Sequence, residues 1–120
     1  MHTVLLIVED EPDIRLAYET MAEDLLESVE VRSTASVPEA KEVLSDVLRS
    51  GANVFALVDG EIGNERGEDF AQYARSQGKI WIIACSAQAH TWGNDNFRKP
   101  FNHAELAACI VLRMRQQATA

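Results

Sequence analysis

The stretch Val4-Leu5-Leu6-Ile7-Val8-Glu9-Asp10-Glu11-Pro12 decides the fold. Its five apolar residues are too few for a membrane span and are typical of a strand that is buried on both faces of a parallel sheet. Acidic residues follow at once, and Pro12 suits the first turn of a helix, where no backbone N–H is needed. The stretch therefore predicts a buried strand that leads through an acidic turn into a helix.

The same alternation continues along the chain. Residues 54–58 and 80–84 are two further apolar runs, and residues 29–34 and 96–98 are weaker strand candidates. Between them, apolar residues recur at helical spacing, and Ser36 with Glu39 has the spacing of a capping box. Residues 59–68 look like a polar loop. Strands that alternate with helices predict an α/β fold with a parallel sheet covered on both faces.

Composition excludes several functional classes. The 120 residues fit one domain, and 47% hydrophobic with 25% charged residues is ordinary for a globular protein. The net charge of -8 disfavours nucleic acid or an anionic membrane as a partner, because both need clustered Lys and Arg. Cys85 and Cys109 lack metal-ligand spacing, so we expect both to be reduced in a cytoplasmic protein.

Polar side chains follow the ends of the predicted strands. Glu9 and Asp10 follow the first strand, Asp59 the third, Ser86 the fourth and Lys99 the fifth. Ligands of open α/β sheets bind beyond the carboxyl ends of the strands, so we expect these side chains at one rim. Carboxylates suit Mg²⁺, and a carboxylate can itself be a nucleophile. Lysine and a hydroxyl can stabilise a phosphoryl group in transfer.

In segment order and motif order the chain resembles the response-regulator receiver family of two-component signalling. The resemblance rests on Glu9-Asp10, Val58-Asp59, Gly67, Cys85-Ser86-Ala87 and Lys99-Pro100-Phe101. It implies a doubly wound, flavodoxin-like sheet of five parallel strands in the order 2-1-3-4-5, as in chemotaxis regulators. We expect one stand-alone receiver domain over residues 1–120, without an output domain, because the last predicted helix ends at residue 120.

The resemblance implies a role for each acidic residue. Asp59 would accept a phosphoryl group from a histidine kinase or a histidine phosphotransfer protein. Asp10, Asp59 and the backbone carbonyl of Glu61 would bind Mg²⁺ directly, and Glu9 would act mostly through water.

The remaining implied features concern phosphoryl contacts and output. Ser86 and Lys99 would contact the phosphoryl oxygens, and the Lys99–Pro100 bond would be cis. The domain would not be an enzyme in its own right, although it would assist its own phosphorylation and dephosphorylation. It would act on a downstream protein target in the cytoplasm.

The chain departs from the family pattern in three places. Gly63 stands where the family usually has proline, and Asn96 stands at a position that is normally an aromatic switch. The distance in sequence from Ser86 to Lys99 is also shorter than usual.

The short segment before the fifth strand predicts that the fourth helix is absent or reduced to a short turn, because a parallel crossover usually needs about a dozen residues. Its loss should expose an apolar patch near Ile82, Ile83 and Phe97. We expect a homodimer or another partner on that patch, with a contribution from Trp92.

Two other functions fit parts of the sequence. The departures at Gly63 and Asn96 suit a pseudo-receiver, a binding module that keeps the fold without cycling phosphate. A phosphohydrolase with an aspartyl-phosphate intermediate, like the haloacid dehalogenases, fits less well because that family has Asp-x-Asp at a strand end. The acidic residues could also serve only to favour the start of the first helix.

Overall fold

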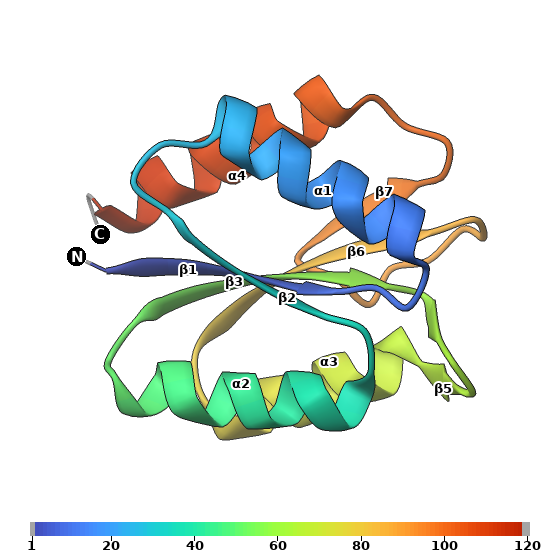
Figure 1. The fold of residues 1–120 in the computed structure, drawn as a ribbon, viewed down its shortest axis with the longest axis horizontal. Coiled ribbons are helices and arrows are strands. Elements are labelled where there is room, and N and C mark those ends of the chain that lie inside the picture. The colour runs from blue at the N-terminus through green and yellow to red at the C-terminus, as the bar shows by residue number, and fades with distance from the viewer. Residues whose placement is uncertain (1, 119–120) are drawn as a thin grey trace.

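The sheet that the sequence predicts is present in a computed structural model that describes residues 2–118 (Figure 1). Five parallel strands pair in the order β2-β1-β3-β6-β7. They are β1 (Thr3–Val8), β2 (Glu30–Thr34), β3 (Asn53–Asp59), β6 (Ile80–Ser86) and β7 (Asp95–Arg98). A separate two-stranded hairpin, β4 (Glu61–Ile62) with β5 (Glu65–Arg66), lies in the loop after β3. Counted without this hairpin, the order is the expected 2-1-3-4-5.

Four helices cover the two faces of the sheet. They are α1 (Pro12–Leu25), α2 (Val37–Arg49), α3 (Gly67–Gln77) and α4 (His103–Ala118). Figure 1 shows α1 and α4 on one face and α2 and α3 on the other. Leu5 and Ile7 belong to the core under α1 and α4, whereas Val4, Leu6 and Val8 belong to the core under α2 and α3. All six residues of β1 are buried, which explains its uninterrupted apolar run.

Local sequence explains where the helices begin. Glu39 donates its backbone N–H to Ser36 Oγ across 3.3 Å, and its own carboxylate accepts the backbone N–H of Ala35 at 2.8 Å. The predicted capping box is therefore confirmed, with its return bond one residue earlier than usual. The polar loop after Asp59 is shorter than expected, because the β4–β5 hairpin occupies it and α3 already begins at Gly67.

The crossover from β6 to β7 contains no helix within residues 87–94, as the sequence predicts. The helix labelled α4 is the C-terminal one. The crossover packs directly on β6, because the backbone N–H of Ile82 donates to Asn94 Oδ1 and the N–H of Asn94 donates to the Ile82 carbonyl, both at 2.8 Å. Gly93 lies so close to Ala84 that a Cβ at position 93 would come within 2.7 Å of the Ala84 Cβ.

The predicted apolar patch over the missing helix is wrong. Ile82 and Ile83 are both 0% exposed. Ile83 belongs to the core under α1 and α4, on the face that the fourth helix would not cover, and the half-buried Phe97 packs against that core. Ile82 belongs to the opposite core, against which Trp92 packs. The exposed side chains of β7 are the polar Asn96 and Arg98. Polar residues therefore face the solvent on the strand that a fourth helix would otherwise cover.

None of the helices within residues 2–118 combines the length and the apolar character that crossing a bilayer requires. Cys85 and Cys109 are both free, the first buried and the second half-buried.

Candidate functional site

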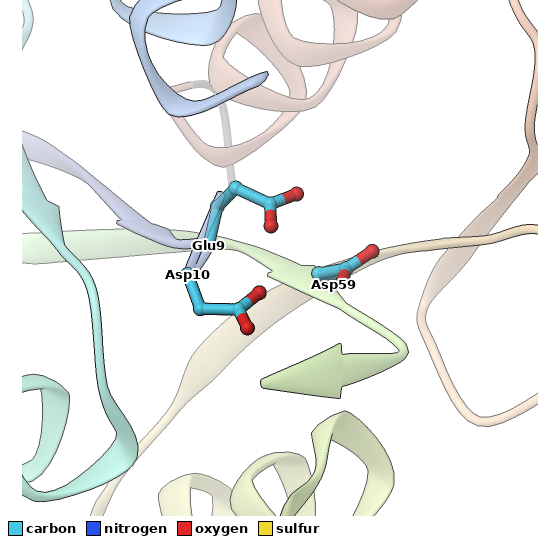
Figure 2. A group of neighbouring side chains, drawn as sticks. All are labelled: Glu9, Asp10 and Asp59. Atoms are coloured by element: carbon cyan, nitrogen blue, oxygen red, sulfur yellow. The ribbon is translucent and has the colours of Figure 1, made fainter. Parts of the chain in front are cut away.

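Three carboxylates meet at the carboxyl ends of β1 and β3. Oxygens of Glu9, Asp10 and Asp59 all lie within 4.8 Å of one another. The parallel register pairs Val8 with Val58, so the residues that follow each strand emerge side by side. Figure 2 shows the three side chains next to one another at the ends of the two strands. The sequence predicted this cluster, and an all-oxygen donor set of this kind fits a hard cation such as Mg²⁺.

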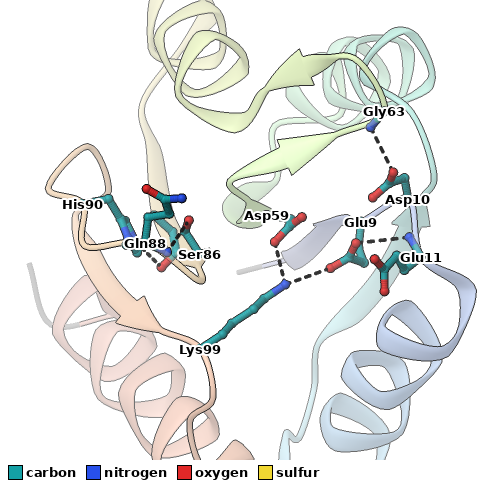
Figure 3. Close-up of polar contacts among 10 residues, drawn as sticks. Glu9, Asp10, Glu11, Asp59, Gly63, Ser86, Gln88, His90 and Lys99 are labelled. Atoms are coloured by element: carbon teal, nitrogen blue, oxygen red, sulfur yellow. Dashed lines mark hydrogen bonds and ion pairs between the residues drawn. The ribbon is translucent and has the colours of Figure 1, made fainter.

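Lys99 supplies a positive charge to the carboxylates from the end of β7. Its Nζ lies 2.6 Å from Asp59 Oδ1 and 3.5 Å from Glu9 Oε1 (Figure 3). The backbone N–H of Lys99 donates to the carbonyl of Ser86 at 2.8 Å, and the Lys99–Pro100 bond is cis, as expected. Burial by itself lowers the pKa of Lys99, but the hydrogen bond to Asp59 and the two nearby negative charges outweigh it and raise that pKa. Lys99 is therefore a firmly charged partner of Asp59.

Glu9 is the most buried of the three acids, with 1% of its surface exposed. Burial, with a smaller contribution from the charge of Asp59, raises the pKa of Glu9 to about 7. The backbone N–H of Glu11, which donates to Glu9 Oε2 at 3.1 Å, and the charge of Lys99 both act in the opposite direction. The site therefore holds less negative charge near neutral pH than three free carboxylates would.

Asp10 is bound to the tip of the β4–β5 hairpin. The backbone N–H of Gly63 donates to Asp10 Oδ2 at 3.0 Å, and Gly63 has φ +63°. Proline has no N–H and cannot adopt a positive φ, so the family's usual residue could not make this turn or this bond. The departure at position 63 therefore belongs to a different loop structure that still reaches the acidic site.

Ser86 reaches the same rim from β6, but its hydroxyl is bonded to the crossover. Ser86 Oγ accepts the backbone N–H of Gln88 at 3.2 Å. A Cβ at position 60 would lie 2.6 Å from this oxygen, so Gly60 lets the loop after Asp59 pass close to Ser86. Glu61 follows in β4 with an exposed side chain, and the metal-binding role of its carbonyl stays a prediction.

Three features of the site could not be found by sequence reasoning: the Asp10–Gly63 bond, the hairpin itself and His90. His90 lies beside Ser86 and Gln88 in Figure 3, and its Nε2 is 3.1 Å from the carbonyl oxygen of Ala84. Nothing in the local sequence spacing of His90 links it to the strand ends.

Comparison with known sequences finds no match for this chain, whereas comparison with solved structures finds many. No protein-family profile matches this sequence, and no curated protein matches it either. Solved structures do match. A response regulator receiver domain protein, CheY-like, from Methanospirillum hungatei JF-1 has a TM-score of 0.83 at 18% identity, over 99% of this chain and 98% of that one.

Two further matches agree with the first. The signal receiver domain of a putative Luxo repressor protein from Vibrio parahaemolyticus has a TM-score of 0.77 at 17% identity, over 97% of this chain and 92% of that one. The BeF3-activated N-terminal receiver domain of RstA from Klebsiella pneumoniae has a TM-score of 0.74 at 19% identity, with coverages of 94% and 99%. The resemblance read from the motifs is thus confirmed for the fold over nearly the whole chain.

Proposed function

We propose that this chain, which has the receiver-domain fold, accepts a phosphoryl group on Asp59 and transmits a signal by changing its affinity for a protein partner. One observation carries the proposal. Asp59 Oδ1 lies 2.6 Å from Lys99 Nζ, and the Asp59 carboxylate also belongs to the cluster with Glu9 and Asp10. A nucleophilic carboxylate, a cation and a set of metal-ligand oxygens at one rim suit phosphoryl transfer.

The donor we propose is the phosphohistidine of a histidine kinase or of a histidine phosphotransfer protein. One Asp59 oxygen forms a bond to phosphorus while the phosphorus–nitrogen bond of the donor breaks, and its electron pair stays on the imidazole nitrogen. Lys99 already contacts Asp59 Oδ1 and stabilises the charge of the transferred group. Ser86 donates its hydroxyl hydrogen to a phosphoryl oxygen, and side-chain rotation toward that oxygen moves Oγ away from the backbone N–H of Gln88.

Asp10, Asp59 and the carbonyl of Glu61 are the groups that would hold Mg²⁺ directly, with Glu9 acting through water. When bound, Mg²⁺ neutralises negative charge on the phosphoryl oxygens. The hydrogen bond from Gly63 takes one oxygen of Asp10 and leaves the other for a cation.

The test is intact mass after incubation with Mg²⁺ and a small-molecule phosphodonor such as a phosphoramidate. We expect the wild-type chain to gain one phosphoryl group and Asp59→Asn to gain none, because the amide keeps the shape but is no nucleophile. Asp46→Asn, which changes an exposed carboxylate on α2, is the matched control and should gain one. A phosphoryl group on Asp59→Asn contradicts the assignment of the acceptor.

The helix-free crossover and Asn96 favour a second candidate, a pseudo-receiver that binds a partner without cycling phosphate. The same measurement separates the two, since a pseudo-receiver gains no mass. In either case we place the domain in the cytoplasm with a protein partner, and we expect no turnover of free phosphate esters.

A further inference from the structure

Asn96 cannot carry a signal in the way that an aromatic residue at this position would. Its Oδ1 accepts the backbone N–H of Gly93 at 2.9 Å, and its Nδ2 donates to the Gly93 carbonyl at 3.0 Å. Both ends of the amide are thus used to close the turn before β7, and the side chain is exposed. A change at Asp59 must therefore reach the surface through other residues.

A continuous set of contacts leads from Ser86 into the crossover instead. Ser86 Oγ accepts the Gln88 N–H at 3.2 Å, and the Gln88 carbonyl oxygen lies 2.8 Å from His90 Nδ1 (Figure 3). His90 Nε2 lies 3.1 Å from the carbonyl oxygen of Ala84. The imidazole is therefore held between two carbonyl oxygens, one of which belongs to the turn that the Ser86 hydroxyl closes.

Trp92 continues these contacts to the start of α3. The His90 and Trp92 rings lie 5.5 Å apart between centroids. A Cβ at Gly67 would lie 3.1 Å from Trp92 Cη2 and would collide with the carbonyl oxygen of Asp59. Trp92 therefore rests on the first residue of α3, directly after the loop that Asp59 begins, and only glycine at position 67 allows this approach.

An open cleft lies between the loop after β3 and the crossover. Its volume is about 450 Å³, and its lining includes Gly60, Ser86, His90 and Trp92. Trp92 is half-buried and packs on the edge of the core under α2 and α3. It therefore lies between the edge of this core and the cleft.

We infer that the helix-free crossover responds to phosphorylation of Asp59 through a path that bypasses Asn96. In order, the path runs through Ser86, Gln88, His90 and Trp92. When the Ser86 side chain rotates about its Cα–Cβ bond to bring Oγ to a phosphoryl oxygen, the Gln88 N–H loses its acceptor and the turn opens. His90 then loses one of its two carbonyl contacts, and Trp92 moves from Gly67 toward the cleft. The inference rests on the proposed phosphorylation of Asp59.

The test uses Trp92 as its own reporter. The chain has two tryptophans, so Trp81→Phe leaves Trp92 as the single one. Emission of Trp81→Phe is recorded with Mg²⁺, before and after a small-molecule phosphodonor, and intact mass is measured on the same samples. We expect the emission maximum to shift to longer wavelength in proportion to the phosphorylated fraction, because Trp92 gains contact with water.

Three variants in the Trp81→Phe background locate the path, compared at equal phosphorylated fraction. Ser86→Ala should lose the shift, because it has no hydroxyl to move. His90→Ala should lose most of the shift, whereas Asn96→Ala should keep it. In the reciprocal protein, Trp92→Phe with Trp81 intact, emission should stay unchanged on phosphorylation. If Trp81→Phe folds poorly, the shift of the wild-type chain compared with that of Trp92→Phe gives the contribution of Trp92.

The outcomes are distinguishable. Phosphorylation by mass with an unchanged or blue-shifted Trp92 emission overturns the inference and leaves the proposed function standing. A shift that survives in Ser86→Ala, or that disappears in Asn96→Ala, also overturns the path. A chain that gains no mass overturns the proposed function and the inference with it.

Discussion

The backbone N–H of Gly63 donates to Asp10 Oδ2 across 3.0 Å, and this bond joins residues 53 positions apart. It connects the tip of the β4–β5 hairpin to the acidic cluster. The hairpin thus contributes to the site through a backbone N–H. Gly63 adopts φ +63° at the tip, with no neighbouring atom close to where a Cβ would stand.

Gly63→Ala tests how much this turn contributes to the free energy of unfolding and to Mg²⁺ binding. We expect a loss of about 1 kcal/mol in the free energy of unfolding, because L-residues are strained at positive φ. Gly51→Ala is the matched control, since Gly51 has φ +78° and equally open surroundings but lies far along the chain from the site. Urea denaturation should give similar losses for both. Only the Gly63 variant should change the affinity for Mg²⁺. If both variants bind Mg²⁺ with the same affinity, the hairpin makes no contribution to the site.

Mg²⁺ should stabilise the fold through the acidic cluster. A cation at ten times its Kd adds about 1.4 kcal/mol to the free energy of unfolding when it binds only the folded chain. We expect this gain in wild type and expect it to be lost in Asp10→Asn, as measured by thermal unfolding with and without Mg²⁺. Asp46→Asn should keep the gain. An Asp10→Asn chain that Mg²⁺ stabilises as much as wild type would place the cation elsewhere.

Lys99→Met should slow phosphorylation of Asp59 by about a hundredfold, which is typical when one group that stabilises transferred charge is removed. The measurement is the rate of mass gain with a small-molecule phosphodonor. Lys79→Met, at an exposed lysine before β6, is the control and should react at the wild-type rate. If the two variants react equally fast, Lys99 has no part in the transfer.

We expect Asp95, which is not part of the acidic cluster, to make the stability of the fold depend on pH. Arg113 donates to both carboxylate oxygens of Asp95 at 2.7 and 3.0 Å, and Trp81 Nε1 donates at 2.6 Å. The hydrogen bond from Arg113 holds the pKa of Asp95 below its ordinary value of 3.8, despite the opposing effect of burial. A lowered folded pKa contributes stability above 3.8, and that contribution is lost as the pH falls through the folded pKa.

Asp95→Asn should therefore cost about 2 kcal/mol at pH 7, the typical worth of a hydrogen bond to a charged group. The difference from wild type should shrink as the pH is lowered below 3.8, as followed by urea denaturation across pH. Asp69→Asn, at an exposed acid on α3, should show neither effect. A difference that stays constant down to low pH would mean that packing, not charge, explains the loss.

Asn94 should be essential for the crossover that replaces a helix. Its Oδ1 accepts the backbone N–H of Ile82, a residue with no exposed surface, and also accepts from Arg75 at 3.2 Å. Asn94→Ala leaves that N–H without its acceptor, which costs about 1 to 3 kcal/mol. Asn64→Ala, in the exposed hairpin turn, should cost almost nothing. Equal unfolding curves for the two variants would show that the bond contributes nothing to stability.

The sequence correctly predicts that the crossover contains no helix, but it wrongly predicts an exposed apolar patch beside it. Eight residues between two parallel strands are too few for a regular helix and two turns, and this argument from length needs no tertiary information. Exposure of the sheet does need it. Ile82 and Ile83 are neighbours in sequence but face opposite sides, so only one of them lies on the side of the missing helix.

The sequence by itself determined the buried strands, their alternation with helices, the order of Glu9, Asp10, Asp59, Ser86 and Lys99 along the chain, and the lack of a helix before β7. These features depend on periodicity, on length and on which residues directly follow a strand, all of which are local. Only the tertiary structure decided that the N–H of Gly63 bonds Asp10, that the hydroxyl of Ser86 accepts the N–H of Gln88, and that Trp92 rests on Gly67. Those contacts depend on the conformation of two loops and on how closely β3 and β6 bring them together, and no local pattern encodes the distance between residues that meet only after folding.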